Sequence, residues 1–335
     1  MSGREEQENY LNGRCDRIVA ESPAVVRKYY ASFKNGRTAS SRTTYLSYVN
    51  IYINYLKENG FDVDNFDVFS SIRPADIDEF LDDYREGRTG NGIKKSDASV
   101  VSMYNIVKSF YQFLYNNDYI PKDPFTKVNK PKNNVNKKPV YLTKEEINSV
   151  KKEIFSSRNN YYGDSEDKEY WQARDYVIFV LGYRTGLRRS AIAAINVEDI
   201  NFEENYILVT EKGNVTRECY FGDDTKELLL KWLNIRKYLL RIKQKECDAL
   251  FISKQRRRLT SVSINEIVEK YTGHLDKHIT AHKLRATCAT NLWEKTGDIY
   301  LVAEQLGHKN LSNTRKYTNI SSEKKRKAAA ALDDL

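Results

Sequence analysis

Apolar and aromatic side chains recur every three or four positions through much of the first third of the chain. Between residues 41 and 60 this spacing places them on one face of a helix. Ser40 or Ser41 suits the capping position at the start of this helix, and Gly60 follows its end. The apolar face consists of Tyr45, Tyr48, Val49, Tyr52, Tyr55 and Leu56.

Two further helices are predicted in the same region. Residues 73–87 carry a proline near their start and end with a glycine, which suits a short helix. A third apolar stripe follows, formed by Val100, Met103, Tyr104, Val107, Phe110, Tyr111 and Leu114. We therefore interpret residues 22–120 as a compact helical domain, preceded by an N-terminal extension over residues 1–21.

The pattern changes at residues 121–140, which we interpret as an interdomain linker. Residues 121–139 hold four of the chain's six prolines, many lysines and a single acid, Asp123. Proline favours extended backbone, and clustered lysines attract phosphate. The segment is predicted to lie along nucleic acid, and the alternative is a solvated tether with no partner. The candidate DNA-binding lysines are Lys130, Lys132, Lys137 and Lys138.

Residues 141–320 read as a second domain that is mostly helical. Thr143 and Glu146 have the spacing of a capping box, and residues 173–186 predict a buried helix that ends at Gly186. Two β-rich runs between residues 205 and 221 flank a Lys-Gly-Asn turn, which predicts a hairpin. The expected fold class is mainly α with a small antiparallel β-sheet.

The composition and the net charge indicate what kind of molecule the protein binds. The chain is 40% hydrophobic, 30% charged and 12% aromatic, as expected for a soluble globular protein. Its formal net charge of +9 favours an anionic partner, nucleic acid first, although a basic protein without such a partner remains the alternative. The most apolar stretch, residues 176–183, is too short to span a bilayer, and the polar start has no secretory signal. We expect a cytoplasmic protein.

The cysteines and glycines exclude several kinds of site. The four cysteines lie far apart, with no CxxC pair, which is not the spacing of a disulfide framework or a zinc site. The sequence also lacks a glycine-rich phosphate loop and a dinucleotide fingerprint. We therefore expect neither a metal nor a cofactor.

Six residues in four short stretches of the second domain stand out as candidate chemical groups. They are Arg188, Lys212, His282, Arg285, His308 and Tyr317. His282 and Arg285 are three positions apart and so share one helix face. Taken singly, each residue has a structural interpretation, such as a cation at a helix end, a solvated lysine at a hairpin tip or a core tyrosine. Together they form a set of cations, imidazoles and one phenol.

Attack on a phosphodiester without a metal requires such a set. The transition state carries extra negative charge on its nonbridging oxygens, and planar arginine forks bind two such oxygens at once. A tyrosine, with a pKa of about 10, becomes a nucleophile when a base removes its proton or cations stabilise its anion. A lysine can protonate the leaving 5′ oxygen. The phosphotyrosine ester conserves the bond energy, so the strand can be rejoined without ATP.

The order and spacing of the six positions resemble the tyrosine recombinase (phage integrase, Xer-type) family. The stretches that carry the resemblance are TGLR at 185–188, HKLRATCAT at 282–290 and LGHKNLSNTRKYT at 306–318. The resemblance covers residues 141–320, and the helical region before them resembles the family's core-binding, or SAM-like, domain. It implies a site-specific recombinase that acts on double-stranded DNA with paired half-sites and assembles into dimers and tetramers there.

The resemblance also implies a role for each residue. Arg188 and Arg285 would bind the scissile phosphate, and Lys212 would be the general acid toward the 5′ oxygen. His282 would assist proton transfer. His308 would hydrogen-bond the phosphate and help place the tyrosine. Tyr317 would attack to form a 3′-phosphotyrosyl intermediate.

The sequence departs from the family pattern at two positions. The family often has Glu three residues after the first arginine and His directly after the second, whereas this chain has Ala191 and Ala286. The first departure puts the support of Arg188 in doubt. Two alternatives remain open, a type IB topoisomerase-like enzyme and a DNA-binding protein that has lost catalysis. The little sequence before residue 22 suggests no additional arm-binding domain.

The tail, residues 321–335, predicts a short helix with four alanines and two leucines. A helix of this length is not stable alone in water. It is expected either to fray or to dock on a neighbouring protomer.

Overall fold

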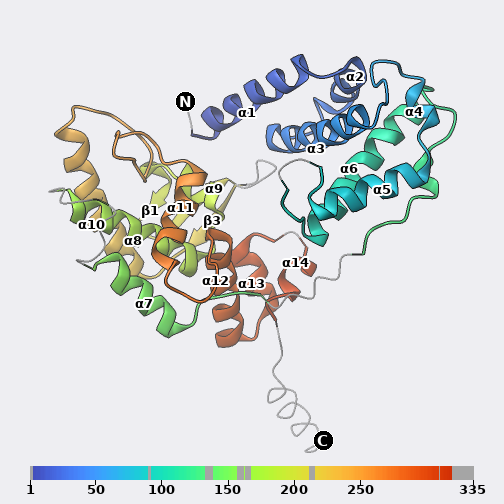
Figure 1. Cartoon of the computed structure of the whole chain (residues 1–335). Helices are drawn as coiled ribbons and strands as arrows, with labels where there is room; N and C mark the ends of the chain where they lie inside the picture. The colour runs from blue at the N-terminus through green and yellow to red at the C-terminus, as the bar shows by residue number, and fades with distance from the viewer. Residues whose placement is uncertain are drawn as a thin grey trace, which may run out of the picture. The chain divides into compact units, whose positions relative to one another are not determined.

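The computed structural model describes residues 3–89, 92–132, 139–156, 162, 167–210, 216–308 and 310–318. The chain divides into two compact units, Met1–Lys137 and Lys138–Leu335, and Figure 1 follows the elements of each. The described residues are mainly helical with one small antiparallel sheet, which confirms the predicted fold class. No helix among them is long and apolar enough to cross a membrane.

The first unit is helical wherever it has regular structure in the described residues. Its elements are α1 (Gly3–Ala20), α2 (Ala24–Phe33), α3 (Ala39–Glu58), α4 (Val68–Ser71), α5 (Pro74–Glu86), α6 (Asp97–Asn116) and the 3-10 turn η1 (Pro124–Thr126). The three predicted helices are confirmed as α3, α5 and α6. The predicted cap of α3 was wrong, because Thr38, rather than Ser40 or Ser41, accepts the hydrogen bond from the Ser41 backbone N–H at 3.3 Å.

Tyrosines fill much of the core of this unit. Tyr52 and Tyr111 are both buried and share a hydrogen bond of 2.7 Å between their hydroxyl oxygens. Burial raises the pKa of both phenols, so both stay neutral. Because each hydroxyl is a partner for the other, the core holds two phenols without leaving a buried polar group unpaired.

Segments at both ends of the first unit also join its core. Helix α1 lies within the predicted N-terminal extension and places Cys15 in the core, with its Sγ 3.2 Å from Thr43 Oγ1. Phe125 and Val128, within the segment interpreted as a linker, are buried in the same core. Residues 121–128 therefore pack with the first unit, and Lys130 and Lys132 follow them as exposed side chains.

The second unit packs its helices around α8. Its helices are α7 (Lys144–Ile154), α8 (Lys168–Thr185), α9 (Arg189–Ala194), α10 (Asp223–Arg241), α11 (Ser261–Thr272), α12 (Ala281–Thr296), α13 (Ile299–Leu306) and α14 (Ser312–Arg315), with the 3-10 turn η2 (Val197–Asp199). Helix α8 is apolar on most sides and contacts α7, α9, α10, α11 and α12. A helix buried in this way forms the centre of the domain core.

Local sequence signals in this unit hold in the structure. Thr143 and Glu146 form the predicted capping box, with bonds of 3.3 Å from the Glu146 N–H and 2.7 Å from the Thr143 N–H. Helix α8 starts earlier than predicted and ends where predicted, since Gly186 follows it with a φ of +67°.

The sheet has three antiparallel strands in the order β1 (Ile200–Asn201), β2 (Tyr206–Thr210) and β3 (Thr216–Tyr220). Strands β2 and β3 confirm the predicted hairpin, with Val209 opposite Arg217, and β1 adds an edge that the sequence analysis did not predict. The predicted turn residues Lys212, Gly213 and Asn214 lie outside the described residues.

A buried ionic network joins α8, α11 and the segment before α8. The Asp175 carboxylate is fully buried and accepts bonds from Arg174 at 2.7 Å, Tyr162 at 2.5 Å, Tyr271 at 2.9 Å and Lys270 at 3.1 Å. Burial lowers the pKa of Lys270, and Asp175 acts in the opposite direction. The carboxylate is the anion that neutralises the buried Arg174 and the partly buried Lys270.

We predict that Asp175→Ala lowers the free energy of unfolding by about 3–5 kcal/mol, because it leaves the buried Arg174 and the partly buried Lys270 without their counter-ion. Urea unfolding followed by circular dichroism measures this. Asp224→Ala is the matched control, since Asp224 is 83% exposed and pairs with Arg184 at 3.3 Å. Its loss should stay below about 1 kcal/mol. Equal losses in the two variants would contradict the assigned role of the network.

Candidate functional site

Arg285 lies at the point where two other helices end. It stands on α12 and is 1% exposed. Its Nη1 donates to the Gly186 carbonyl at 2.6 Å, and its Nη2 donates to the Leu306 carbonyl. These two carbonyls lie at the C-terminal ends of α8 and α13. Unsatisfied carbonyl oxygens give the C-terminal end of a helix partial negative charge. One guanidinium therefore links the ends of two helices to a third helix.

Gly186 makes this arrangement possible in two ways. Its φ of +67° is a left-handed conformation that side chains oppose. A Cβ at this position would lie 2.6 Å from Leu306 Cδ2 and 3.2 Å from Cys288 Sγ. The sequence identified this glycine as a helix end, and the structure adds that side chains of α12 and α13 pack directly against it.

Arg188 follows two residues later, as the N-cap of the short helix α9. Leu187, between Gly186 and Arg188, is fully buried, so the chain is anchored immediately before the arginine. The Arg188 side chain itself is partly exposed. Burial is the first cause that lowers the pKa of His282 and of His308, and the charge of Arg188 contributes to both shifts.

His308 is held by a hydrogen bond and a ring contact. Its Nδ1 lies 2.8 Å from Oγ1 of the buried Thr314, and its ring is nearly parallel to that of Tyr317, with centroids 6.5 Å apart. Partial burial, followed by the charges of Arg285 and Arg188, lowers the pKa of His308 to about 4. His308 is therefore a neutral imidazole at neutral pH.

His282 is kept neutral by the same kind of surroundings. Its side chain is exposed at the start of α12. Loss of hydration is nevertheless the first cause that lowers its pKa, and the charges of Lys316 and Arg285 follow. A neutral imidazole beside cations can accept a proton from a hydroxyl group.

Tyr317 is 3% exposed and packs in a small cluster with Ala286, Ala289, Val302 and Leu306. The position at which the chain departs from the family pattern, Ala286, thus forms part of the surface against which this phenol packs. In Figure 1 the helices that contribute to the cluster, α12 and α13, lie side by side, and α14, which precedes the tyrosine, lies beside α13.

The structure brings together five of the six predicted residues and adds one cation. Lys316 was missed by the sequence analysis; its Nζ lies 4.8 Å from the centre of the Tyr317 ring, and its charge acts on both histidines. The signal was available as the basic residue directly before the tyrosine. Lys212 lies outside the described residues, as do Lys137, Lys138 and the tail 321–335.

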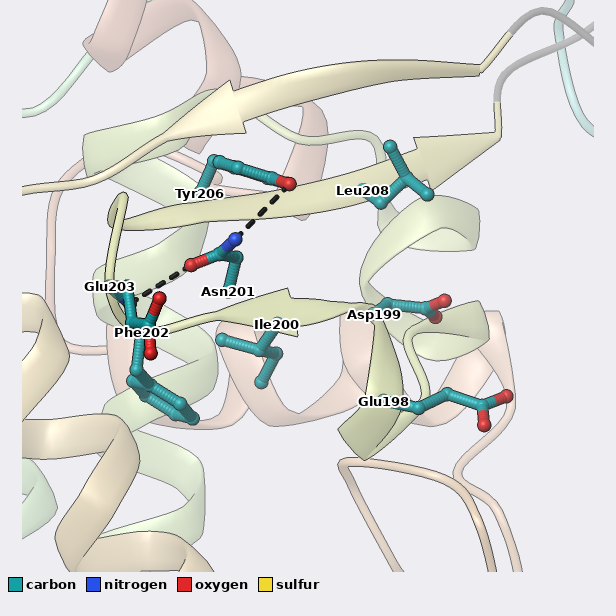
Figure 2. A pocket seen from close by; sticks show the side chains of 8 residues that line it. All are labelled: Glu198, Asp199, Ile200, Asn201, Phe202, Glu203, Tyr206 and Leu208. Atoms are coloured by element: carbon teal, nitrogen blue, oxygen red, sulfur yellow. Dashed lines mark hydrogen bonds between the residues drawn. The ribbon is translucent and has the colours of Figure 1, made fainter.

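A different part of the second unit carries an open acidic pocket. Figure 2 shows the carboxylates of Glu198, Asp199 and Glu203 around it, with the Asn201 side chain donating to the Tyr206 hydroxyl at 3.2 Å. Its lining contains none of the six candidate residues, and its negative charge is unsuited to phosphate. Among the described residues, no group of three or more His, Cys, Asp or Glu side chains could hold a metal ion.

Comparison with known proteins gives two kinds of match. The model of the phage integrase family matches residues 141–324. A tyrosine recombinase XerC of Alcanivorax borkumensis is 30% identical over 239 residues, which cover 71% of each chain. A tyrosine recombinase XerD of Staphylococcus epidermidis is 31% identical over 236 residues, covering 70% of this chain and 75% of the relative.

Solved structures show the same fold at lower identity. The XerH recombinase bound to a palindromic difH substrate, in a post-cleavage complex, matches with a TM-score of 0.69 at 22% identity, covering 97% of this chain and 89% of that one. A lambda integrase dimer bound to a COC′ core site matches with a TM-score of 0.66 at 17% identity, covering 88% of this chain and 94% of that one.

The lowered pKa of His308 predicts a pH-dependent stability. The pKa is about 4 in the folded chain against 6.5 for an ordinary histidine, so on acidification the unfolded chain binds the proton first. The stability associated with neutral His308 is therefore complete above pH 6.5 and is lost as the pH falls toward 4. Urea unfolding across this range should show a steeper loss for the wild type than for His308→Gln. Parallel curves would mean that His308 titrates alike in both states.

Proposed function

We propose a reaction for this chain, which belongs to the phage integrase family of tyrosine recombinases. It is a site-specific DNA recombinase. We assign to its own residues the cleavage and rejoining of DNA through a covalent 3′-phosphotyrosyl intermediate. The observation that supports the assignment is the convergence of two arginines, two neutral histidines and Tyr317 in the second unit.

In the proposed cleavage step, the Tyr317 hydroxyl oxygen forms a bond to the scissile phosphorus, and the bond from phosphorus to the 5′ oxygen breaks. Arg188 and Arg285 stabilise the negative charge on the nonbridging oxygens, as preorganised cations do in such transition states. His282 accepts the tyrosine proton, and Lys212 protonates the 5′ oxygen. Attack of a 5′ hydroxyl from another strand on the phosphotyrosine reverses these steps and releases Tyr317.

Lys316 adds a cation close to the nucleophile. It lies directly before Tyr317 and over its ring. A cation there adds to the positive charge that stabilises the scissile phosphate as the tyrosine attacks. We assign Lys316 to this role beside His308, whose ring lies nearly parallel to the tyrosine ring.

The two units divide the work on DNA in this proposal. The helical unit Met1–Lys137 and the catalytic unit Lys138–Leu335 would each bind the duplex, and Lys130, Lys132, Lys137 and Lys138 would contact its phosphates. The solved neighbours include recombinase dimers bound to DNA and a tetramer bound to a Holliday junction. We propose the same assemblies here, in the cytoplasm, with the tail 321–335 docking on a neighbouring protomer.

The central test is the nucleophile. Randomised duplexes that form a denaturation-resistant adduct with the wild-type chain can be recovered and sequenced, which identifies a target site. On that site Tyr317→Phe should retain DNA binding and reduce adduct formation by at least about 10³-fold, because it removes only the attacking oxygen. Denaturing gels measure the adduct.

Tyr300→Phe is the matched control, since Tyr300 is 70% exposed on α13 and should form adduct like the wild type. An adduct on Tyr317→Phe would assign the nucleophile to another residue. Absence of any wild-type adduct would overturn the proposed reaction. Strand exchange between two labelled duplexes distinguishes a recombinase from an enzyme that only nicks and closes one strand.

The role of Lys212 is tested by changing the leaving group. Lys212→Ala should slow cleavage of normal DNA by about 10²–10⁴-fold, the usual contribution of a general acid. With sulfur in place of the 5′ bridging oxygen, the defect should shrink to within about 10-fold, because a thiolate leaves without a proton. Lys231→Ala, which removes an exposed lysine of α10, is the control. Equal defects on both substrates would assign Lys212 to binding instead.

A further inference from the structure

Helix α9, which Arg188 caps at its N-terminal end, is held at its C-terminal end by a second arginine. Arg258 Nη1 lies within hydrogen-bond distance of three successive carbonyl oxygens, those of Ala193 at 3.2 Å, Ala194 at 3.0 Å and Ile195 at 3.3 Å. Its Nη2 donates to Asn196 Oδ1 at 2.6 Å. These carbonyls form the C-terminal end of α9, where partial negative charge attracts a cation.

We propose that Arg258 is a positioning residue for Arg188. The two arginines stand at opposite ends of one helix of six residues, with Arg188 as its N-cap and Arg258 bound to its last carbonyls. The inference rests on the proposed function, in which Arg188 stabilises charge on the scissile phosphate.

Helix α9 needs outside support because it is very short. A helix of six residues is about 9 Å long and unstable by itself in water. Its sequence, RSAIAA, contributes Ile192 and Ala193 to the core. Ala191, three residues after Arg188, has a methyl side chain that cannot form a hydrogen bond. The direction of the helix axis therefore depends on packing along its apolar side and on the clamp at its C-terminal end.

Arg258 is itself well anchored. Ile252 pairs with Arg258 in an antiparallel bridge, and the Leu259 N–H donates to the Phe251 carbonyl at 3.0 Å. The Leu250 N–H donates to the Ile195 carbonyl at 2.8 Å, which joins the same segment to the residue that ends α9. Helix α11 begins shortly after Arg258 and packs on α9. The clamp thus connects α9 to a fixed part of the unit.

Removal of the Arg258 contacts should therefore displace Arg188. A tilt at the C-terminal end of so short a helix moves the N-cap as well, and a misplacement of about 1 Å can cost about 10²-fold in rate. A positioning role and a general structural role differ in one respect. Only the first predicts that the defect depends on the negative charge of the scissile phosphate.

The test compares two substrates on the recovered target site. One carries the normal phosphodiester, and the other carries a methylphosphonate, in which a methyl group replaces one charged nonbridging oxygen. Arg188→Ala provides the reference, because an arginine that neutralises this charge matters less when the charge is absent. Arg258→Ala should slow adduct formation about 10–100-fold on the phosphodiester and less than about 3-fold on the methylphosphonate, in parallel with the reference.

Two further variants sharpen the result. Arg258→Lys keeps a cation at the helix end but loses the planar fork, so it should recover part of the phosphodiester rate. Arg257→Ala removes the adjacent exposed arginine and should behave like the wild type on both substrates. Thermal melting of each variant reports the folding of the second unit.

The possible outcomes distinguish a failure of the positioning role of Arg258 from a failure of the proposed function. Equal slowing of Arg258→Ala on both substrates, or no slowing on either, would overturn the positioning role. Failure of the wild-type chain to form any adduct would instead overturn the proposed function. A defect that vanishes on the methylphosphonate supports the positioning of Arg188 by Arg258, whatever the change in melting temperature.

Discussion

A buried guanidinium needs acceptors for its N–H groups, and this requirement organises the second unit. Arg285 is 1% exposed and donates to the Gly186 and Leu306 carbonyls, which end α8 and α13. Without them the unpaired charge would cost several kcal/mol. Both helices therefore have to end beside α12, and the positive φ angles of Gly186 and Gly307 allow them to do so. The site is assembled around this junction, with Arg188 after one helix end and His308 after the other.

The same junction sets the electrostatics of the site. Burial is the first cause that lowers the pKa of the two histidines, and the charges of Arg188, Arg285 and Lys316 add to it at both. Gathering these cations costs free energy in the absence of an anion, and in the proposed reaction a DNA phosphate offsets that cost. The arrangement combines an affinity for phosphate with imidazoles that remain neutral at the pH where a base is needed. A chain with net charge +9 concentrates part of that excess where the proposed chemistry occurs.

Signals contained within a few residues were predictable. The capping box of Thr143 and Glu146, the end of α8 at Gly186 and the hairpin pairing of β2 with β3 are all confirmed. Errors arose where neighbouring residues compete for one role, as at the start of α3, where Thr38 caps in place of Ser40 or Ser41. Lys316 was missed because a basic residue acquires a role only through the ring and the histidines beside it in space. The two-residue strand β1 has too few residues to form a recognisable alternating pattern.

The sequence alone determined the helical character of both units, the small sheet, the family resemblance and the identity of the six candidate residues. These follow from side-chain periodicity, from caps and from short motifs, all of which act over a few positions. Only the tertiary structure decided which groups hold the candidates in place. Arg285 reaches the Gly186 carbonyl across 99 positions, and Arg258 reaches the Ala193 carbonyl across 65. Backbone carbonyls are the same in every residue, so no sequence pattern marks the one that a distant arginine will bind. That choice is made when the core packs and brings unsatisfied helix ends within reach of a buried charge.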